Sequence, residues 1–321
     1  MIASVVRKAY RHVSVVGLLV PPALGLLCLG ILTPTVFDPS NIAAVLLQSS
    51  IVGVMSLGMT FVLVSGRVDL SVGSLLSLAT MVAIDVHDRA GPLAAVASAL
   101  GVGLAVGATN AFLIAFLRLN SLIATLAMLS LLQGITMIYS SGQDLTIGSP
   151  SATWFRAIGR GQMLSVPVPV VIFALSALTA GVLLHATTYG RKLFAVGGNE
   201  RASFHTGLRT GRVVTSVYLI SGLATAAAAL IMGSRVMGAQ TNTGAGYEFD
   251  VIAAVALGGT SLMGGRGSIA GSVIGVVVLA FLQNGLLQLG LPFYTQWMIT
   301  SLIIITSVWI DATAKRDRVL A

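Results

Sequence analysis

The sequence predicts an all-α polytopic membrane protein with about ten transmembrane helices, some short or broken, and one short cytosolic helix. Hydrophobic residues make up 56% of the 321 positions and charged residues only 9%, whereas soluble domains carry about a quarter charged residues. Apolar runs of membrane-spanning length recur along the whole chain, and basic residues gather between them. We therefore treat residues 1–321 as a single transmembrane domain.

The apolar runs define the predicted spans, because a helix needs about 20 apolar residues to cross the hydrocarbon. The ten candidates are Val15–Leu32, Ile42–Val64, Leu70–Ile84, Leu93–Leu117, Leu122–Tyr139, Val166–His185, Val213–Gly233, Val251–Met263, Ile269–Leu291 and Trp297–Ile310. The third and the eighth are short and glycine-rich, so they either cross as broken helices or dip into the membrane and return.

Basic segments predict the orientation, since Lys and Arg are retained on the cytoplasmic side. They are Thr187–Arg212 and the two termini, which carry Arg7, Lys8 and Arg11, and Lys315, Arg316 and Arg318. Ten crossings put all three in the cytosol, whereas a re-entrant eighth segment alone would turn the C-terminus outward. This topology explains the 18 Lys and Arg against 10 Asp and Glu without a nucleic-acid partner. The outward loops then include Ser140–Ser165 and Ser234–Asp250.

The segment Thr187–Arg212 is predicted to be a cytosolic loop that contains a short helix, Glu200–Thr206. Its signals are, in order, Gly197 and Gly198 as chain breakers, Asn199 as an N-cap, Glu200 at the positive helix end and Gly207 as a stop. Such a helix is too short to be stable alone. Either it packs on a partner protein, or it is a connecting loop that lies on lipid headgroups.

Polar residues inside the spans are few and uncharged: Gln48, Ser49, Ser50, Thr60, Asn110, Thr125, Gln133, Gln283 and Asn284. A lining of amides and hydroxyls without carboxylates suits a neutral, hydroxylated solute and argues against proton coupling. The alternative is that these amides join helices. Small residues at Gly101, Gly103, Gly107, Ala224–Ala229 and Gly271–Gly275 predict close helix packing.

Arg67 and Asp69 place charges at the membrane edge, where an ionisable residue is costly without a partner or a role. Asp69, followed by Ser71, stands where an N-cap belongs, so capping is the simpler interpretation and gating the alternative. The surrounding stretch, SGRVDLSVGSLL, is echoed by GGRGSIAGSVIG at Gly264–Gly275. Both join an incoming to an outgoing predicted span, as repeats in transporters do, although glycine-rich turns can match by chance.

Motifs for chemistry within this chain are not found. The sequence has no H-E-x-x-H motif and no G-x-x-x-x-G-K-[ST] phosphate loop. Cys28 is its single cysteine, so no cysteine pair can form within the chain. Without these patterns we predict no metal site, no cofactor in this chain and no enzymatic activity of its own.

Four blocks closely resemble one family. They are GMTFVLVSGRVDLSVGSLLSL (Gly58–Leu78), IATLAMLSLLQGITMIYSSG (Ile123–Gly142), the GRKLFAVGGNERAS loop, and GAGYEFDVIAAVALGGTSLMGGRGSIAGSVIG (Gly244–Gly275). In this order they resemble the permease subunits of bacterial ATP-binding-cassette (ABC) sugar importers, a branched-chain amino acid/monosaccharide permease superfamily that includes the ribose transporter permease. The resemblance extends from about Ile42 to Asp311.

The resemblance implies a permease of the bacterial inner membrane with both termini cytosolic. It would pair with a second copy or a paralogue, two cytosolic ATPase subunits that bind ATP and Mg, and a periplasmic sugar-binding protein. It matches Gly197, Gly198, Asn199, Glu200, Arg201 and Ala202 to the loop that docks on the ATPase. As path or gate candidates we take Asp69, Ser71, Asn110, Thr125, Gln283 and Asn284.

One departure from the family pattern is Arg67, where the family commonly has glycine, and its effect stays open. A self-contained secondary carrier and an intramembrane enzyme are the competing functional classes. A carrier is expected to hold a buried acid or cation site, and an enzyme needs a nucleophile with a base. Neither pattern is found, so the sequence favours the importer permease, with the cargo left open among monosaccharides and related polyols.

Overall fold

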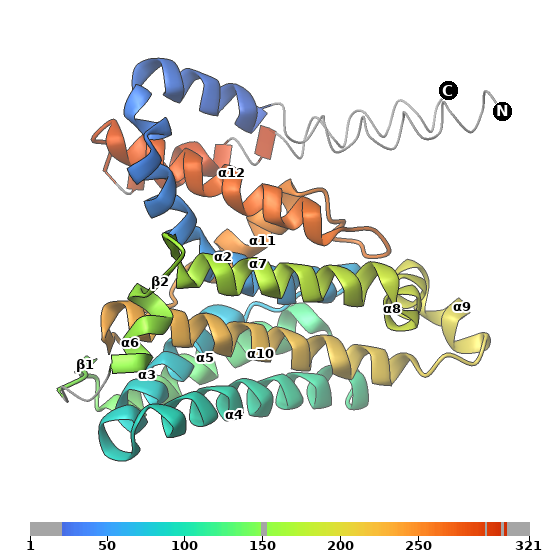
Figure 1. Ribbon diagram of the computed structural model, residues 1–321. Helices are drawn as coiled ribbons and strands as arrows, with labels where there is room; N and C mark the ends of the chain where they lie inside the picture. The colour runs from blue at the N-terminus through green and yellow to red at the C-terminus, as the bar shows by residue number, and fades with distance from the viewer. Residues whose placement is uncertain (1–20, 149–152, 293, 303–304, 307–321) are drawn as a thin grey trace, which may run out of the picture.

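The computed structural model describes residues 21–148, 153–292, 294–302 and 305–306, and in this part the chain is almost entirely helical (Figure 1). An apolar helix, Pro21–Leu32, is followed by η1 (Pro34–Phe37), α2 (Pro39–Val64), α3 (Val72–Ala90), α4 (Pro92–Ala111), a π-helical turn η2 (Phe112–Phe116) and α5 (Ser121–Ser140). Then come α6 (Thr153–Arg160), α7 (Val168–Gly181), a second π-helical turn η3 (Val182–Ala186), α8 (Thr188–Gly198), α9 (Glu200–His205), α10 (Thr210–Val236), α11 (Tyr247–Leu257) and α12 (Ile269–Gln288).

Within this described part, six helical stretches are long and apolar enough to cross a membrane: Pro39–Val64, Pro92–Phe116, Ser121–Ser140, Val168–Ala186, Thr210–Val236 and Ile269–Gln288. Each corresponds to a predicted span, with ends within three residues of the predicted ones. The agreement follows from the local signal, because an uninterrupted apolar run leaves the backbone no alternative to helix in hydrocarbon. The first and the last predicted spans lie partly outside the described residues, and the basic clusters of both termini lie wholly outside them.

The two short predicted spans differ from each other. The third is an unbroken helix, α3, but it runs beyond Ile84 and carries Asp85, Asp88 and Arg89 near its end. The eighth is shifted: α11 begins at Tyr247 and ends at Leu257, so its 11 residues span roughly 16 Å. Gly259, with φ +84°, follows its end and closes the helix. Alone, α11 is too short to cross the hydrocarbon.

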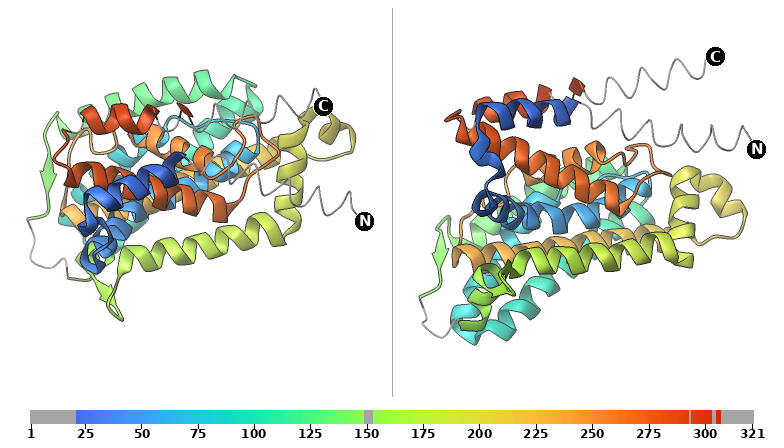
Figure 2. Two further views of the ribbon diagram at one scale, coloured as in Figure 1. Left: turned by 90° about the horizontal axis from the view of Figure 1, so that it is seen from above. Right: turned by 45° about the horizontal axis from the view of Figure 1, so that its top comes forward.

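Short helices and the strand pairs lie at two opposite ends of the bundle (Figures 1 and 2). One end holds α8 and α9. The other holds α6 and two small antiparallel pairs, β1 (Leu145–Thr146) with β4 (Gly238–Ala239), and β2 (Gln162–Met163) with β3 (Val166–Pro167). The predicted outward loops and the basic segment 187–212 therefore lie at opposite ends, as the predicted topology requires.

Helix α10 forms the centre of the bundle and packs against α4, α2 and α3. The contact with α4 is backbone to backbone: a methyl group on Gly103 would lie 2.5 Å from the Gly222 carbonyl oxygen, and one on Gly107 would lie 2.6 Å from the Tyr218 carbonyl oxygen. The close packing predicted for Gly103 and Gly107 is thus confirmed, whereas Gly101 faces open space.

Candidate functional site

The segment 187–212 forms two helices where the sequence predicts a loop with one. Thr187 Oγ1 accepts a hydrogen bond from Gly190 N–H at 3.3 Å and starts α8, a cap that the sequence analysis missed. Helix α8 ends at Gly198. Asn199 Oδ1 then accepts a hydrogen bond from Ala202 N–H at 2.9 Å and caps the start of α9. Gly207, with φ +85°, follows its end. The predicted short helix and its N-cap are confirmed, and α8 is the correction.

Three backbone segments meet at the C-terminal end of α8: that end itself, the connection after α2 and the connection before α12. We call this contact the glycine junction, and its residues are Gly66, Gly197, Gly198, Gly264 and Gly265. Gly265 N–H donates to the Val64 carbonyl at 2.9 Å. A methyl group on Gly264 would lie 2.6 Å from both Gly197 O and Gly66 Cα. The end of α8 therefore touches the connection after α2 and the connection before α12 at once. These two connections are the pair of echoed sequence stretches.

An ion pair spans the same contact. Arg67 Nη2 lies 2.8 Å from Glu200 Oε2, and the Arg67 side chain is largely covered while that of Glu200 is half exposed. Arg67 Nη1 also donates to the Ser65 carbonyl at 3.2 Å. The residue that departs from the family pattern thus joins the α2–α3 connection to the first residue of α9. No local pattern in the sequence indicates this pairing, because 133 positions separate the two residues.

A basic cavity of about 880 Å³ opens beside this ion pair, at the α8–α9 end of the bundle. Its charged lining is Arg67, Arg118, Arg201, Arg209 and Glu200, and Phe204 contributes an aromatic edge that is 65% exposed. With four arginines against one glutamate, the cavity has a positive charge that attracts acidic groups.

Asp69 stands at the centre of a buried polar cluster in the α2–α3 connection. Its Oδ1 accepts from Ser71 N–H at 3.1 Å and Ser71 Oγ at 2.6 Å, and its Oδ2 accepts from Ser221 Oγ on α10 at 2.9 Å. Asn110 Nδ2 on α4 donates to Ser71 Oγ at 2.8 Å. Burial raises the pKa of the Asp69 carboxyl, against these hydrogen bonds, which lower it. The N-cap of α3 is Ser71, and its side chain makes no capping hydrogen bond, so the N-cap role predicted for Asp69 is wrong. Asp69 instead closes the turn before α3 and joins this connection to α10 through Ser221 and to α4 through Asn110.

Thr125 does not belong to this cluster. It is fully buried, and its hydroxyl donates to the Ser121 carbonyl in its own helix at 2.8 Å. That bond satisfies the hydroxyl within α5 and is typical of a packing residue.

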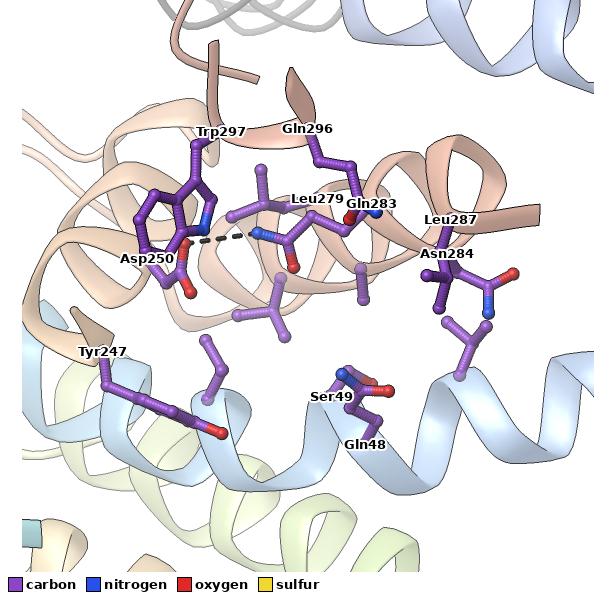
Figure 3. A pocket seen from close by; sticks show the side chains of 14 residues that line it. Gln48, Ser49, Tyr247, Asp250, Leu279, Gln283, Asn284, Leu287, Gln296 and Trp297 are labelled. Carbon is purple, nitrogen blue, oxygen red and sulfur yellow. Dashed lines mark hydrogen bonds between the residues drawn. The ribbon is translucent and has the colours of Figure 1, made fainter. Parts of the chain in front are cut away.

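A second cavity, of about 190 Å³, lies between α2, α11, α12 and the helical residues 294–302, and we call it the amide cavity. Figure 3 shows the side chains of α2 on one side of it and those of α12 on the other. Its polar lining is Gln48, Ser49, Tyr247, Asp250, Gln283, Asn284 and Gln296, with Trp297 beside them.

Gln283 and Asn284 are two adjacent polar residues of α12 that line this cavity. Gln283 Nε2 donates to Asp250 Oδ1 at 3.2 Å. Asn284 Oδ1 accepts from Asn41 Nδ2 at 2.9 Å and from Gln288 Nε2 at 3.0 Å. Of the six path or gate candidates, only these two line the amide cavity, while Asp69, Ser71 and Asn110 gather in the cluster at the α2–α3 connection.

The expectation of a lining without carboxylates was wrong for this cavity. Asp250 and Tyr247 were assigned to an outward loop, but α11 begins at Tyr247, earlier than predicted, and so carries both to the cavity wall. Among the described residues, no group of three His, Cys, Asp or Glu side chains is placed to hold a metal ion.

Residues 41–308 match the model of a family described as branched-chain amino acid transport system / permease component. The ribose import permease protein RbsC of Escherichia coli is 41% identical over 286 residues, which cover 87% of this chain and 88% of that protein. The ribose import permease of Bacillus subtilis is 39% identical over 295 residues (90% and 91%).

A relative with another printed cargo is also similar. The L-arabinose ABC transporter permease protein AraH of Azospirillum brasilense is 33% identical over 291 residues, which cover 90% of this chain and 85% of that protein. No solved structure matches the chain significantly.

Proposed function

The chain belongs to the permease-component family of branched-chain amino acid transport systems, and from this we propose that it is the transmembrane permease subunit of an ABC importer for a monosaccharide or related polyol. The observation that carries the proposal is the similarity to ribose and L-arabinose permeases over most of both chains. ATP hydrolysis then belongs to a partner subunit that binds ATP and Mg, and this chain supplies the path.

The geometry of α8 and α9 supports the proposed coupling role of Gly197, Gly198, Asn199, Glu200, Arg201 and Ala202. These residues lie at one end of the bundle, beside the basic cavity and the glycine junction. A displacement of α9 by a docked ATPase would press on both echoed connections, because the glycines leave no space between the backbones. Packed contacts of this kind transmit small shifts between rigid elements.

The remaining site candidates divide by position. Gln283 and Asn284 are proposed for the solute path because they line the amide cavity. Asp69, Ser71 and Asn110 are proposed as a gate support, since they hold the connection that carries Gly66 and Arg67. Thr125 remains a proposed path or gate residue, but its hydrogen bond within α5 favours a packing role.

The proposed assembly contains a second permease copy or a paralogue, two cytosolic ATPase subunits and a periplasmic sugar-binding protein, in the bacterial inner membrane. About ten crossings with both termini in the cytosol remain the proposed topology. Its supports are the six membrane-length helices, the unbroken α3 and the opposite placement of α9 and the outward loops.

Reconstitution into liposomes tests the function. We expect uptake of radiolabelled D-ribose or L-arabinose only when permease, ATPase, binding protein and ATP are all present. The same proteoliposomes without ATP, or with an ATPase that binds but does not hydrolyse it, are the controls. Solute uptake by the permease alone along a concentration gradient would support the secondary carrier instead.

A further inference from the structure

The chemistry of the amide cavity points to an uncharged ligand rich in hydroxyl groups. Within the described part of the chain, the Gln48 amide makes no protein hydrogen bond, and Gln283 uses only its Nε2, toward Asp250. Donors and acceptors are therefore left over for a ligand. None of the lining residues is Lys, Arg or His, so nothing in the cavity would compensate the charge of an anion.

The volume of the cavity and its aromatic wall further restrict the class of ligand that it can hold. A volume of about 190 Å³ is below the several hundred Å³ of sites for drug-sized molecules and suits one small ring. Trp297 and Asp250 both line the cavity (Figure 3). An aromatic side chain in a cavity lined by a carboxyl group and amides can contact the C–H face of a sugar ring while the polar groups engage its hydroxyls.

The cavity lies far from the coupling end. Gln48 stands 16 positions before the end of α2 at Val64, which is roughly 24 Å along the helix, and α9 is at that far end (Figure 1). The cavity is therefore on the side where a solute delivered from outside would arrive first. At this depth, exposed amides and a carboxyl group facing hydrocarbon would be costly, so the cavity must hold water, solute or a partner surface.

We propose that the amide cavity is a binding station for a single neutral monosaccharide ring within one copy of this chain, with Asp250, Gln283, Gln48 and Asn284 as its hydroxyl contacts and Trp297 as its aromatic wall. The proposal rests on the proposed importer function and adds to it the place where the solute first contacts the permease. Asp250 is a binding residue in this scheme.

A direct binding measurement tests whether the amide cavity binds a monosaccharide. The variant W154F/W309F keeps Trp297 as the sole tryptophan of this chain, and its fluorescence in the full-length purified permease without the ATPase is followed during titration with D-ribose. We expect a saturable change with D-ribose and none with D-gluconate, which carries a carboxylate. Asp250→Asn should weaken D-ribose binding by about tenfold, because it replaces one acceptor oxygen of the carboxyl group with an amide donor.

Glu248→Gln is the matched control, since Glu248 lies in the same first turn of α11 but packs against Gly73 on α3 and does not line the cavity. Its D-ribose affinity should stay that of the parent. The inference is overturned if D-ribose gives no saturable change, or if both variants lose affinity equally.

Sugar uptake measured in parallel distinguishes a failure of the proposed binding site from a failure of the proposed importer function. A complex that imports D-ribose without any binding at Trp297, and whose Asp250→Asn variant imports at the parent rate, keeps the importer function and rejects the station. A complex that imports no sugar under any condition rejects the function itself.

Discussion

Arg67 and Glu200 form an ion pair that joins two separate elements, and we expect this link to affect coupling more than it affects stability. Partly exposed pairs typically contribute about 0.2–1 kcal/mol, and this one joins the α2–α3 connection to α9 at 2.8 Å. We expect Arg67→Glu and Glu200→Arg each to lower the amount of solute moved per ATP about two- to fivefold, since each places like charges together.

The double variant R67E/E200R restores an opposite-charge pair, so it should recover most of the lost coupling, and the defect of the single variants should shrink in high salt. The measurement is uptake against phosphate release in the same proteoliposomes. If the double variant is no better than Glu200→Arg alone, then Glu200 acts only through other contacts.

Gly197 and Gly198 are neighbours with different surroundings, which makes them a matched pair. A methyl group on Gly197 would collide with the Val64 carbonyl oxygen, whereas one on Gly198 would meet nothing within 4 Å. Gly197→Ala should cost about 1–3 kcal/mol, as overpacking does, and should weaken coupling. Gly198→Ala should be neutral or slightly stabilising, because alanine favours helix by about 1 kcal/mol.

Thermal unfolding of the purified permease and its yield of co-purified ATPase measure both effects. Equal behaviour of the two alanine variants would show that the glycine junction is not closely packed in the working protein.

At the scale of elements, α9 depends on its cap because it has only six residues. Loss of an N-cap costs about 0.5–2 kcal/mol, and a helix of this length has no internal reserve to absorb it. Asn199→Ala should therefore lower the affinity for the ATPase several-fold in a pull-down titration with detergent-solubilised permease.

Asn120→Ala is the control, because Asn120 caps α5 in the same manner, accepting from Leu122 N–H at 2.9 Å, but that helix has 20 residues. Its loss should leave ATPase affinity unchanged. An equal decrease in both variants would mean that the effect is not specific to α9.

The helices also show how far sequence reasoning extends. Six spans and the α9 cap were predicted because their signals are local: apolar runs, an Asn at the N-cap and a Gly at the stop. The start of α11 was missed, since Tyr247 and Asp250 look like loop residues in the sequence and only the packing of α11 against α12 extends the helix to them. Likewise, Gln283 was recognisable as a polar residue in a span, but its partner Asp250 lies 33 positions away and no local pattern connects them.

At the scale of the whole molecule, the proposal requires α9 and the β2–β3 hairpin to face opposite sides of the membrane, because they lie at opposite ends of the bundle (Figures 1 and 2). Single cysteines can test this after Cys28, which is exposed, is replaced by serine. Phe204→Cys and Leu164→Cys are suitable positions, being 65% and 93% exposed, whereas Ser203 is buried and a poor target.

In intact cells, a membrane-impermeant maleimide should label Leu164→Cys in the outer compartment but not Phe204→Cys, which should react only after the membrane is opened. The orientation matters because ATP is available only in the cytosol, so α9 can meet an ATPase on that side alone. Labelling of Phe204→Cys in intact cells would place the basic cavity outside. It would then remove the physical basis for coupling through Arg67, Glu200 and the glycine junction together.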